Sequence, residues 1–317
     1  MTTSEPLDVV TLGEAMVMLV AGQPGPLEQV EIFHKRTAGA ETNVAIGLAR
    51  LGLRVGWGSR LGQDSMGRYL LASIQGEGVD CSHVSLVPGE RTGMLFKGQV
   101  LDGSDPPIEY HRAGSAASRM APADVDPAWL LSARHLHATG VFAAVSADSF
   151  QVTRQTMRLM RDAGRTVSFD PNLRPTLWAS TDAMRAGIHE LAALADWVLP
   201  GLEEGRLLTG SQQPESIARF YLDLGASVVV IKLGPDGAYY DDGSRRGYVP
   251  ASPVERVIDT VGAGDGFAVG VISGLLEGRD LPHAVARGAW IGARAVQVLG
   301  DTEGLPTRAV LVQAGLS

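Results

Sequence analysis

The chain has 317 residues, of which 45% are hydrophobic and 20% charged, and it carries a net charge of −8 at neutral pH. The acidic balance excludes a protein that binds a nucleic-acid backbone, because such a protein needs a basic face. One cysteine, Cys81, excludes an internal disulfide framework and fits a reducing compartment. The first six residues do not resemble a signal peptide, and the aliphatic runs are too short to cross a bilayer. We therefore expect a cytoplasmic protein without a membrane partner.

Short β-branched runs alternate with longer helical patterns, which is typical of βαβ units on a parallel sheet. The predicted strands, in chain order, are residues 9–12, 55–59, 135–139, 166–169, 197–199 and 228–231. The predicted helices are residues 43–51, 64–75, 146–163, 181–194, 203–223, 263–276 and 282–299. This order predicts an α/β fold with a doubly wound, mostly parallel sheet flanked by helices.

Two regions, residues 14–37 and 90–112, interrupt the alternation. They contain extended segments at 16–20, 31–33 and 94–100, which we expect to pair as a small separate β-sheet. Ligands of a doubly wound protein bind at the carboxyl ends of the parallel strands, so a β insertion beside that edge would form a lid that excludes water. We predict one α/β domain over residues 1–317 with this lid inserted in it.

The segment over residues 259–270 carries the strongest chemical signal: Asp-Thr-Val-Gly-Ala-Gly-Asp-Gly-Phe-Ala-Val-Gly. Free N–H groups at a helix start favour an anion, so the amides of Gly262, Ala263 and Gly264 could hold a phosphate beside Asp265. That pairing suits phosphoryl transfer, because the carboxylate can accept a hydroxyl proton. A dinucleotide fingerprint would need a third glycine at another position, and the Walker pattern is absent. Asp265 as an ordinary helix cap is the plainer alternative.

These residues resemble the C-terminal signature of the ribokinase (PfkB) family of carbohydrate kinases. The run over residues 38–52, Ala-Gly-Ala-Glu-Thr-Asn-Val-Ala-Ile-Gly-Leu-Ala-Arg-Leu-Gly, is similar to the family's N-terminal signature. The resemblance implies a ribokinase-like fold, ATP and Mg²⁺ as cofactors, and phosphorylation of a sugar hydroxyl. It leaves open a monovalent cation as a further ligand, and a homodimer or higher homo-oligomer assembled through the lid.

The resemblance also implies roles for individual residues. Asp265 would be the base, and the amides of Gly262, Ala263 and Gly264 would form the anion hole. Gly39 and Asn43 would meet the sugar near the lid hinge, and Glu204 would help to organise Mg²⁺ through a water molecule. The asparagine of the family's Asn-x-x-Glu motif is Gly201 in this chain. The residues expected to line the nucleotide are Lys232, Gly234, Asp236 and Gly237.

Three further segments resemble those of 2-keto-3-deoxygluconate kinases within the family. They are the run from Tyr110 to Ala117, the run from Phe169 to Trp178 and the run from Gly300 to Pro306. Arg112 and Arg174 suit a substrate with a carboxylate, because guanidinium pairs with carboxylate through two hydrogen bonds. Tyr110 and Asp301 complete the expected substrate site. His111 and Leu95 depart from the tyrosines expected at their positions.

Other functions compete with a sugar-acid kinase. A fructokinase or another neutral-sugar kinase of the same family shares parts of these segments. A non-catalytic sugar- or nucleoside-binding protein would have the same fold, but a damaged anion hole or a replaced base would be expected of it. A dinucleotide-dependent oxidoreductase lacks support because no glycine fingerprint follows the first strand. His135 and His137 share one strand face, and a metal site there would need a third ligand.

Overall fold

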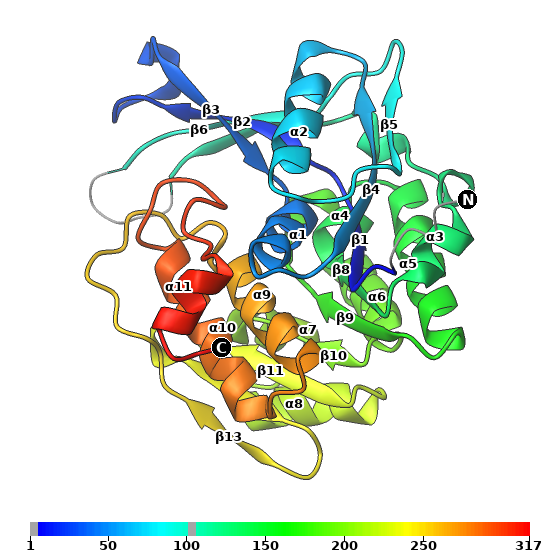
Figure 1. Cartoon of the computed structure of the whole chain (residues 1–317), viewed down its shortest axis with the longest axis vertical. Coiled ribbons are helices and arrows are strands. Elements are labelled where there is room, and N and C mark those ends of the chain that lie inside the picture. The colour runs from blue at the N-terminus through cyan, green and yellow to red at the C-terminus, as the bar shows by residue number, and fades with distance from the viewer. Residues whose placement is uncertain (1–5, 101–105) are drawn as a thin grey trace.

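A computed structural model describes residues 6–100 and 106–317, and a nine-stranded sheet crosses this part of the chain (Figure 1). The strand order is β13-β12-β11-β10-β9-β8-β1-β4-β5, parallel from β11 to β5 and antiparallel at β12 and β13. In chain order the strands are β1 (Val9–Leu12), β4 (Val55–Gly62), β5 (Val84–Val87), β8 (His135–Thr139), β9 (Thr166–Asp170), β10 (Trp197–Val198), β11 (Val228–Lys232), β12 (Ala238–Asp241) and β13 (Arg246–Val249).

Helices cover both faces of this sheet and enclose two hydrophobic cores. Successive strand residues point to opposite faces, so Val9 and Val10 are both fully buried but belong to different cores. The core of Val9 is closed by α1 (Ala40–Arg50), α2 (Ser65–Gly76), α9 (Ala263–Leu276), α10 (Leu281–Ala295) and α11 (Arg308–Gln313). The core of Val10 is closed by α3 (Pro127–Ser132), α4 (Gly140–Ala143), α5 (Ala147–Asp162), α6 (Thr181–Ala192), α7 (Leu202–Thr209) and α8 (Pro214–Asp223). The doubly wound fold predicted from the sequence is confirmed.

A smaller sheet stands beside the main one, at the upper left of Figure 1. Its strands are β2 (Met16–Ala21), β3 (Phe33–Ala38), β6 (Met94–Lys97) and β7 (Ile108–His111), in the order β3-β2-β6-β7. Buried Met16, Met18, Val20, Ala38 and Leu95 form a small core of their own. The extended segment predicted at 16–20 lies in this sheet. The one predicted at 94–100 ends earlier, at Lys97, and the third strand runs later than the predicted 31–33.

Several boundaries differ from the predicted ones for local reasons. The helix predicted over 203–223 is two helices, because Gly210 ends α7 in the left-handed region at φ 74°. Helix α1 begins three residues before the predicted start, directly after Gly39, and α10 ends at Ala295 instead of residue 299. The described residues also form five short 3₁₀ turns: η1 (Leu27–Gln29), η2 (Ala117–Arg119), η3 (Pro122–Asp124), η4 (Pro175–Leu177) and η5 (Gly234–Asp236). None of the helices in the described part of the chain is long and apolar enough to cross a membrane.

Candidate active site

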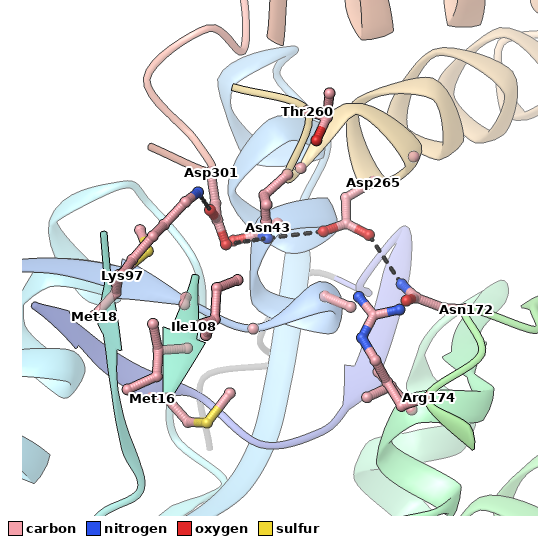
Figure 2. A pocket seen from close by; sticks show the side chains of 18 of the residues that line it. Met16, Met18, Asn43, Lys97, Ile108, Asn172, Arg174, Thr260, Asp265 and Asp301 are labelled. Atoms are coloured by element: carbon pink, nitrogen blue, oxygen red, sulfur yellow. Dashed lines mark hydrogen bonds and ion pairs between the residues drawn. The ribbon is translucent and has the colours of Figure 1, made fainter. Parts of the chain in front are cut away.

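A cavity of about 440 Å³ lies where the carboxyl ends of the parallel strands meet the small sheet. Figure 2 shows side chains from distant parts of the chain converging on it. The strand ends contribute Asp170, Asn172, Arg174, Glu204 and Lys232, and the small sheet contributes Met16, Met18, Leu95, Lys97 and Ile108. The start of α9 closes the third side with Asp265.

The start of α9 depends on a glycine at its N-cap. Gly262 has φ 84°, and a Cβ added there would lie 2.7 Å from the backbone oxygen of Asp301. The left-handed turn therefore requires glycine, and it leaves Gly262 and Gly264 exposed to the cavity. Ala263, the middle residue of the predicted anion hole, does not line the cavity, and its N–H donates to the Thr260 oxygen at 3.4 Å.

Asp265 lies in the first turn of α9 and points into the cavity (Figure 2). Asn43 Nδ2 donates to its Oδ2 at 2.8 Å, and Asn172 Nδ2 lies 3.3 Å from its Oδ1. Burial raises the pKa of Asp265 to about 7; the Asn43 hydrogen bond opposes this rise, and the charges of Asp170 and Asp301 add to it. A carboxyl that titrates near neutral pH suits a general base.

The end of β9 and the turn after it bring Asp170 and Asn172 close to the base, and the end of β11 brings Lys232. Lys232 Nζ pairs with Asp170 Oδ2 at 2.6 Å, and Asp170 Oδ1 accepts the Asn172 N–H at 3.1 Å. Asn172 has φ 37°, a positive value that residues other than glycine rarely adopt, and the rare cases cluster at functional sites. A Cβ on Gly264 would lie 3.4 Å from Lys232 Nζ. The ammonium of Lys232 is therefore next to the start of α9, where it can meet a phosphate.

The two arginines predicted to hold a substrate carboxylate lie together but have different partners. Arg112 pairs with buried Glu14 through Nε at 2.7 Å and through Nη2, and Ser115 Oγ donates to the same carboxylate at 2.5 Å. Arg174 donates from Nη1 to the carbonyl of the preceding residue, and among the described residues no carboxylate pairs with it. Both arginines, with Tyr110, also line a second cavity of about 490 Å³ that adjoins the first.

Glu204, predicted to organise Mg²⁺, lies at the cavity with both carboxylate oxygens engaged. Oε1 accepts the N–H of Leu173 at 2.7 Å, and Oε2 accepts the N–H of Gly201 at 2.7 Å. Glu204 thus caps α7 and ties it to the turn that carries Asn172. Within the described ranges no group of three His, Cys, Asp or Glu side chains could hold a metal ion by itself. This donor set fits a Mg²⁺ ion held mainly by phosphates and water.

The residues predicted to contact sugar and nucleotide are only partly brought together. Gly39, with φ 149° and room for no Cβ beside the Glu14 oxygen, lines the cavity at the start of α1, as do Asn43, Lys232 and Asp301. Three predicted nucleotide residues, Gly234, Asp236 and Gly237, form the turn after β11 and do not line this cavity.

The sequence interpretation did not single out Lys97, Asp170, Asn172 or Asp259 as site residues. Asp170 and Asn172 follow a predicted strand directly, and that position was an available signal for them. Lys97 lies in an apolar run with no signal of its own. Both ring nitrogens of His135 and Nδ1 of His137 bond to hydroxyls of Thr166 and Ser168, which accounts for this buried pair as core residues.

Known proteins resemble this chain over nearly its whole length. The profile of the pfkB family carbohydrate kinases matches residues 6–308. A Bacillus subtilis protein named 2-dehydro-3-deoxygluconokinase is 51% identical over 95% of this chain and 93% of its own length. The crystal structure of a PfkB protein from Polaromonas sp. JS666 is 66% identical, with a TM-score of 0.90 over 96% of this chain and 99% of that one. A putative ribokinase II from E. coli, in complex with ATP and Mg²⁺, is 27% identical with a TM-score of 0.90, covering 97% and 98% of the two chains. The chain belongs to the pfkB family of carbohydrate kinases.

Proposed function

We propose that this protein is an ATP-dependent 2-dehydro-3-deoxygluconate kinase that phosphorylates the 6-hydroxyl of its substrate. The observation that carries the proposal is the position of Asp265, a buried carboxyl with a pKa near 7, directly after the exposed glycines that open α9. The 51% identical relative that bears this enzyme's name supports the choice of substrate.

In the proposed reaction, one Asp265 oxygen accepts the hydroxyl proton while the substrate oxygen bonds to the γ-phosphorus. The bond from that phosphorus to the ADP oxygen breaks in the same step, and the proton later leaves Asp265 for solvent. Amides at Gly262 and Gly264 and the Lys232 ammonium offset the charge of the migrating group. Mg²⁺ bound with ATP would neutralise phosphate charge, with Asp170 and Glu204 as the carboxylates that would hold it through water.

The small sheet, with the chain segments 14–37 and 90–112 around it, is proposed as a lid on a single α/β domain. Its apolar residues at the cavity, Met16, Met18, Leu95 and Ile108, would exclude water from the transferred phosphoryl group. Water that reached the γ-phosphate would compete with the sugar hydroxyl, so a lid of this kind protects ATP from hydrolysis.

Arg174 is the proposed main contact of the substrate carboxylate. Its guanidinium faces both cavities without an acidic partner among the described residues, whereas the charge of Arg112 is already offset by Glu14. A charge that is offset in this way has less attraction for a second carboxylate. The Arg112–Glu14 pair is also the observation that favours the alternative substrate class, a neutral sugar such as fructose.

The proposal is tested by measuring ADP release from ATP with 2-dehydro-3-deoxygluconate, with fructose and without an acceptor. Wild-type protein should prefer the sugar acid, and Asp265→Asn should lose roughly 10²–10⁴-fold in kcat while it still binds ATP. A preference for fructose would move the substrate to the neutral-sugar alternative. An Asp265→Asn variant within threefold of wild type would remove Asp265 from the mechanism.

A further inference from the structure

Lys97 is a charged side chain that is 0% exposed, at the end of lid strand β6 (Figure 2). Its Nζ lies 2.5 Å from Asp259 Oδ2 and 3.7 Å from Asp301 Oδ1. Among the residues that the structure describes, no other cation lies within ion-pair distance of either carboxylate. We infer that Lys97 is a positioning residue that holds the phosphate-binding loop at the start of α9 in shape by joining these two acids. This inference rests on the proposed kinase function.

Asp259 organises the loop that leads into α9. Its Oδ1 accepts the Val261 N–H at 3.1 Å, and its Oδ2 faces the Gly300 N–H at 3.4 Å as well as Lys97. A carboxylate that accepts backbone N–H groups in this way fixes the turn around it. The ammonium of Lys97 completes the partners of that carboxylate and keeps it in place.

Asp301 presses on the same loop from the other side. Its backbone packs against Gly262, where a Cβ would lie 2.7 Å from the Asp301 oxygen. Its side chain reaches the catalytic base through Asn43, which donates to Asp301 Oδ2 at 3.4 Å and to Asp265 Oδ2 at 2.8 Å. Any displacement of Asp301 therefore moves both the glycine turn and the partner of the base.

Without Lys97, two buried carboxylates would face each other with no cation between them. Burial raises the pKa of Asp301 to about 6, the Lys97 ammonium opposes this rise, and the charge of Asp259 adds to it. Uncompensated buried charge is costly, so either the two carboxylates would move apart with their loops or one of them would take up a proton. A negative pair behind Gly262 would also repel the phosphates of ATP. Lys97 cancels that repulsion and links the lid to the loop.

The first test uses Lys97→Met, which keeps the length of the side chain and removes its charge. The matched control is Lys35→Met on β3 of the same sheet, where the lysine is exposed and lies over the Tyr69 ring. We expect kcat/KM for MgATP to fall about 10²-fold in Lys97→Met, the scale of a small misplacement of catalytic groups. The KM for the sugar acceptor should change less than threefold, and the control should match wild type. A KM for the acceptor that rises by as large a factor as the KM for MgATP would overturn the inference.

The second test separates charge from packing and needs no substrate. Thermal unfolding is compared at pH 5 and pH 8 for wild type, Lys97→Met and the double variant Lys97→Met/Asp259→Asn. The titratable groups around Lys97 are its partners Asp259 and Asp301, together with Asp265 and Glu303, which act on Asp301; Glu303 itself pairs with Arg36. Acids without their cation take up protons as pH falls, so Lys97→Met should lose more Tm at pH 8 than at pH 5.

The double variant removes the stranded charge. It should therefore recover part of the Tm and part of the MgATP kcat/KM that Lys97→Met loses. If the single variant folds poorly, this recovery shows whether Lys97 acts through its charge or only through packing. Equal Tm losses at both pH values, together with additive effects in the double variant, would assign Lys97 to packing alone. Failure of the proposed substrate would leave this unfolding result intact, because the result depends on no acceptor.

Discussion

The hydrogen bond from Asn43 to the base gives a prediction whose size follows from the structure. Asn43 Nδ2 donates to Asp265 Oδ2 at 2.8 Å and stabilises the charged carboxylate, which lowers a pKa that burial has raised to about 7. A hydrogen bond to a charged group contributes about 1.5–3 kcal/mol. One pKa unit corresponds to about 1.4 kcal/mol, so Asn43→Ala should raise the pKa of Asp265 by roughly 1–2 units.

The assay is kcat/KM for the sugar acceptor from pH 5 to 9.5, with MgATP in excess. This ratio reports the pKa of the free enzyme's base, so wild-type activity at pH 6 should be roughly a tenth of its high-pH plateau. The acidic limb should move upward in Asn43→Ala. Asn172→Gly is the matched comparison, because glycine keeps the positive φ and the lost bond is longer at 3.3 Å. Its limb should move less. A wild-type limb below pH 5, or an unmoved limb in Asn43→Ala, would refute this reasoning.

Three further predictions concern other groups at the cavity. Asp265→Asn should raise the free energy of unfolding by about 2–4 kcal/mol at pH 8 and by almost nothing near pH 4. The reason is that the folded state holds the Asp265 carboxyl at a raised pKa, so the wild-type protein loses stability as pH rises through that pKa. Urea denaturation at both pH values measures the gain, and an equal gain at both would contradict the prediction. Arg174→Ala should lower kcat/KM for the sugar acid by an amount that corresponds to about 2–4 kcal/mol of lost transition-state stabilisation, and kcat/KM for fructose far less; equal losses on both sugars in steady-state kinetics would count against Arg174. Arg112→Ala should in addition lower Tm in thermal unfolding, because it leaves buried Glu14 without its cation. Glu204→Gln should raise the Mg²⁺ concentration needed for half-maximal rate more than the sugar KM, and an unchanged Mg²⁺ titration would remove that role.

The main sheet and its helices could be predicted because their periodicity is local. Buried strands such as Val228–Lys232 are continuous β-branched runs, and helices such as α9 have both their start and their end marked by glycine. The break between α7 and α8 was marked by Gly210 and by Pro214 at the start of α8, but the long helical pattern around them prevailed in the prediction. The antiparallel strands β12 and β13 were missed because each has only four residues, and β13 is a partly exposed edge strand with little apolar signal.

The candidate site divides in the same way. Asp265 and its glycines are contiguous in sequence, so their chemistry could be inferred from adjacent residues. Partners that are distant in sequence could not be inferred: Lys97 and Asp259 are 162 residues apart, and Arg112 and Glu14 are 98 apart. Nothing local distinguishes a buried, paired lysine from a solvated one, since the distinction depends on what the fold places opposite it.

The order of strands in the main sheet governs when the site can be completed during synthesis. Strand β1 lies between β8 and β4, so its second neighbour arrives only after residues 135–139 have been made. The side-chain hydrogen bonds of Asn43 form still later in synthesis, because their acceptors are Asp265 and Asp301, which lie more than 200 residues further along the chain. Domains that fold as units from the ribosome need the whole unit before they are stable. A nascent chain that has emerged only to the end of α9 carries Asp265 but lacks Asp301, and its loop at Gly262 has nothing to close against.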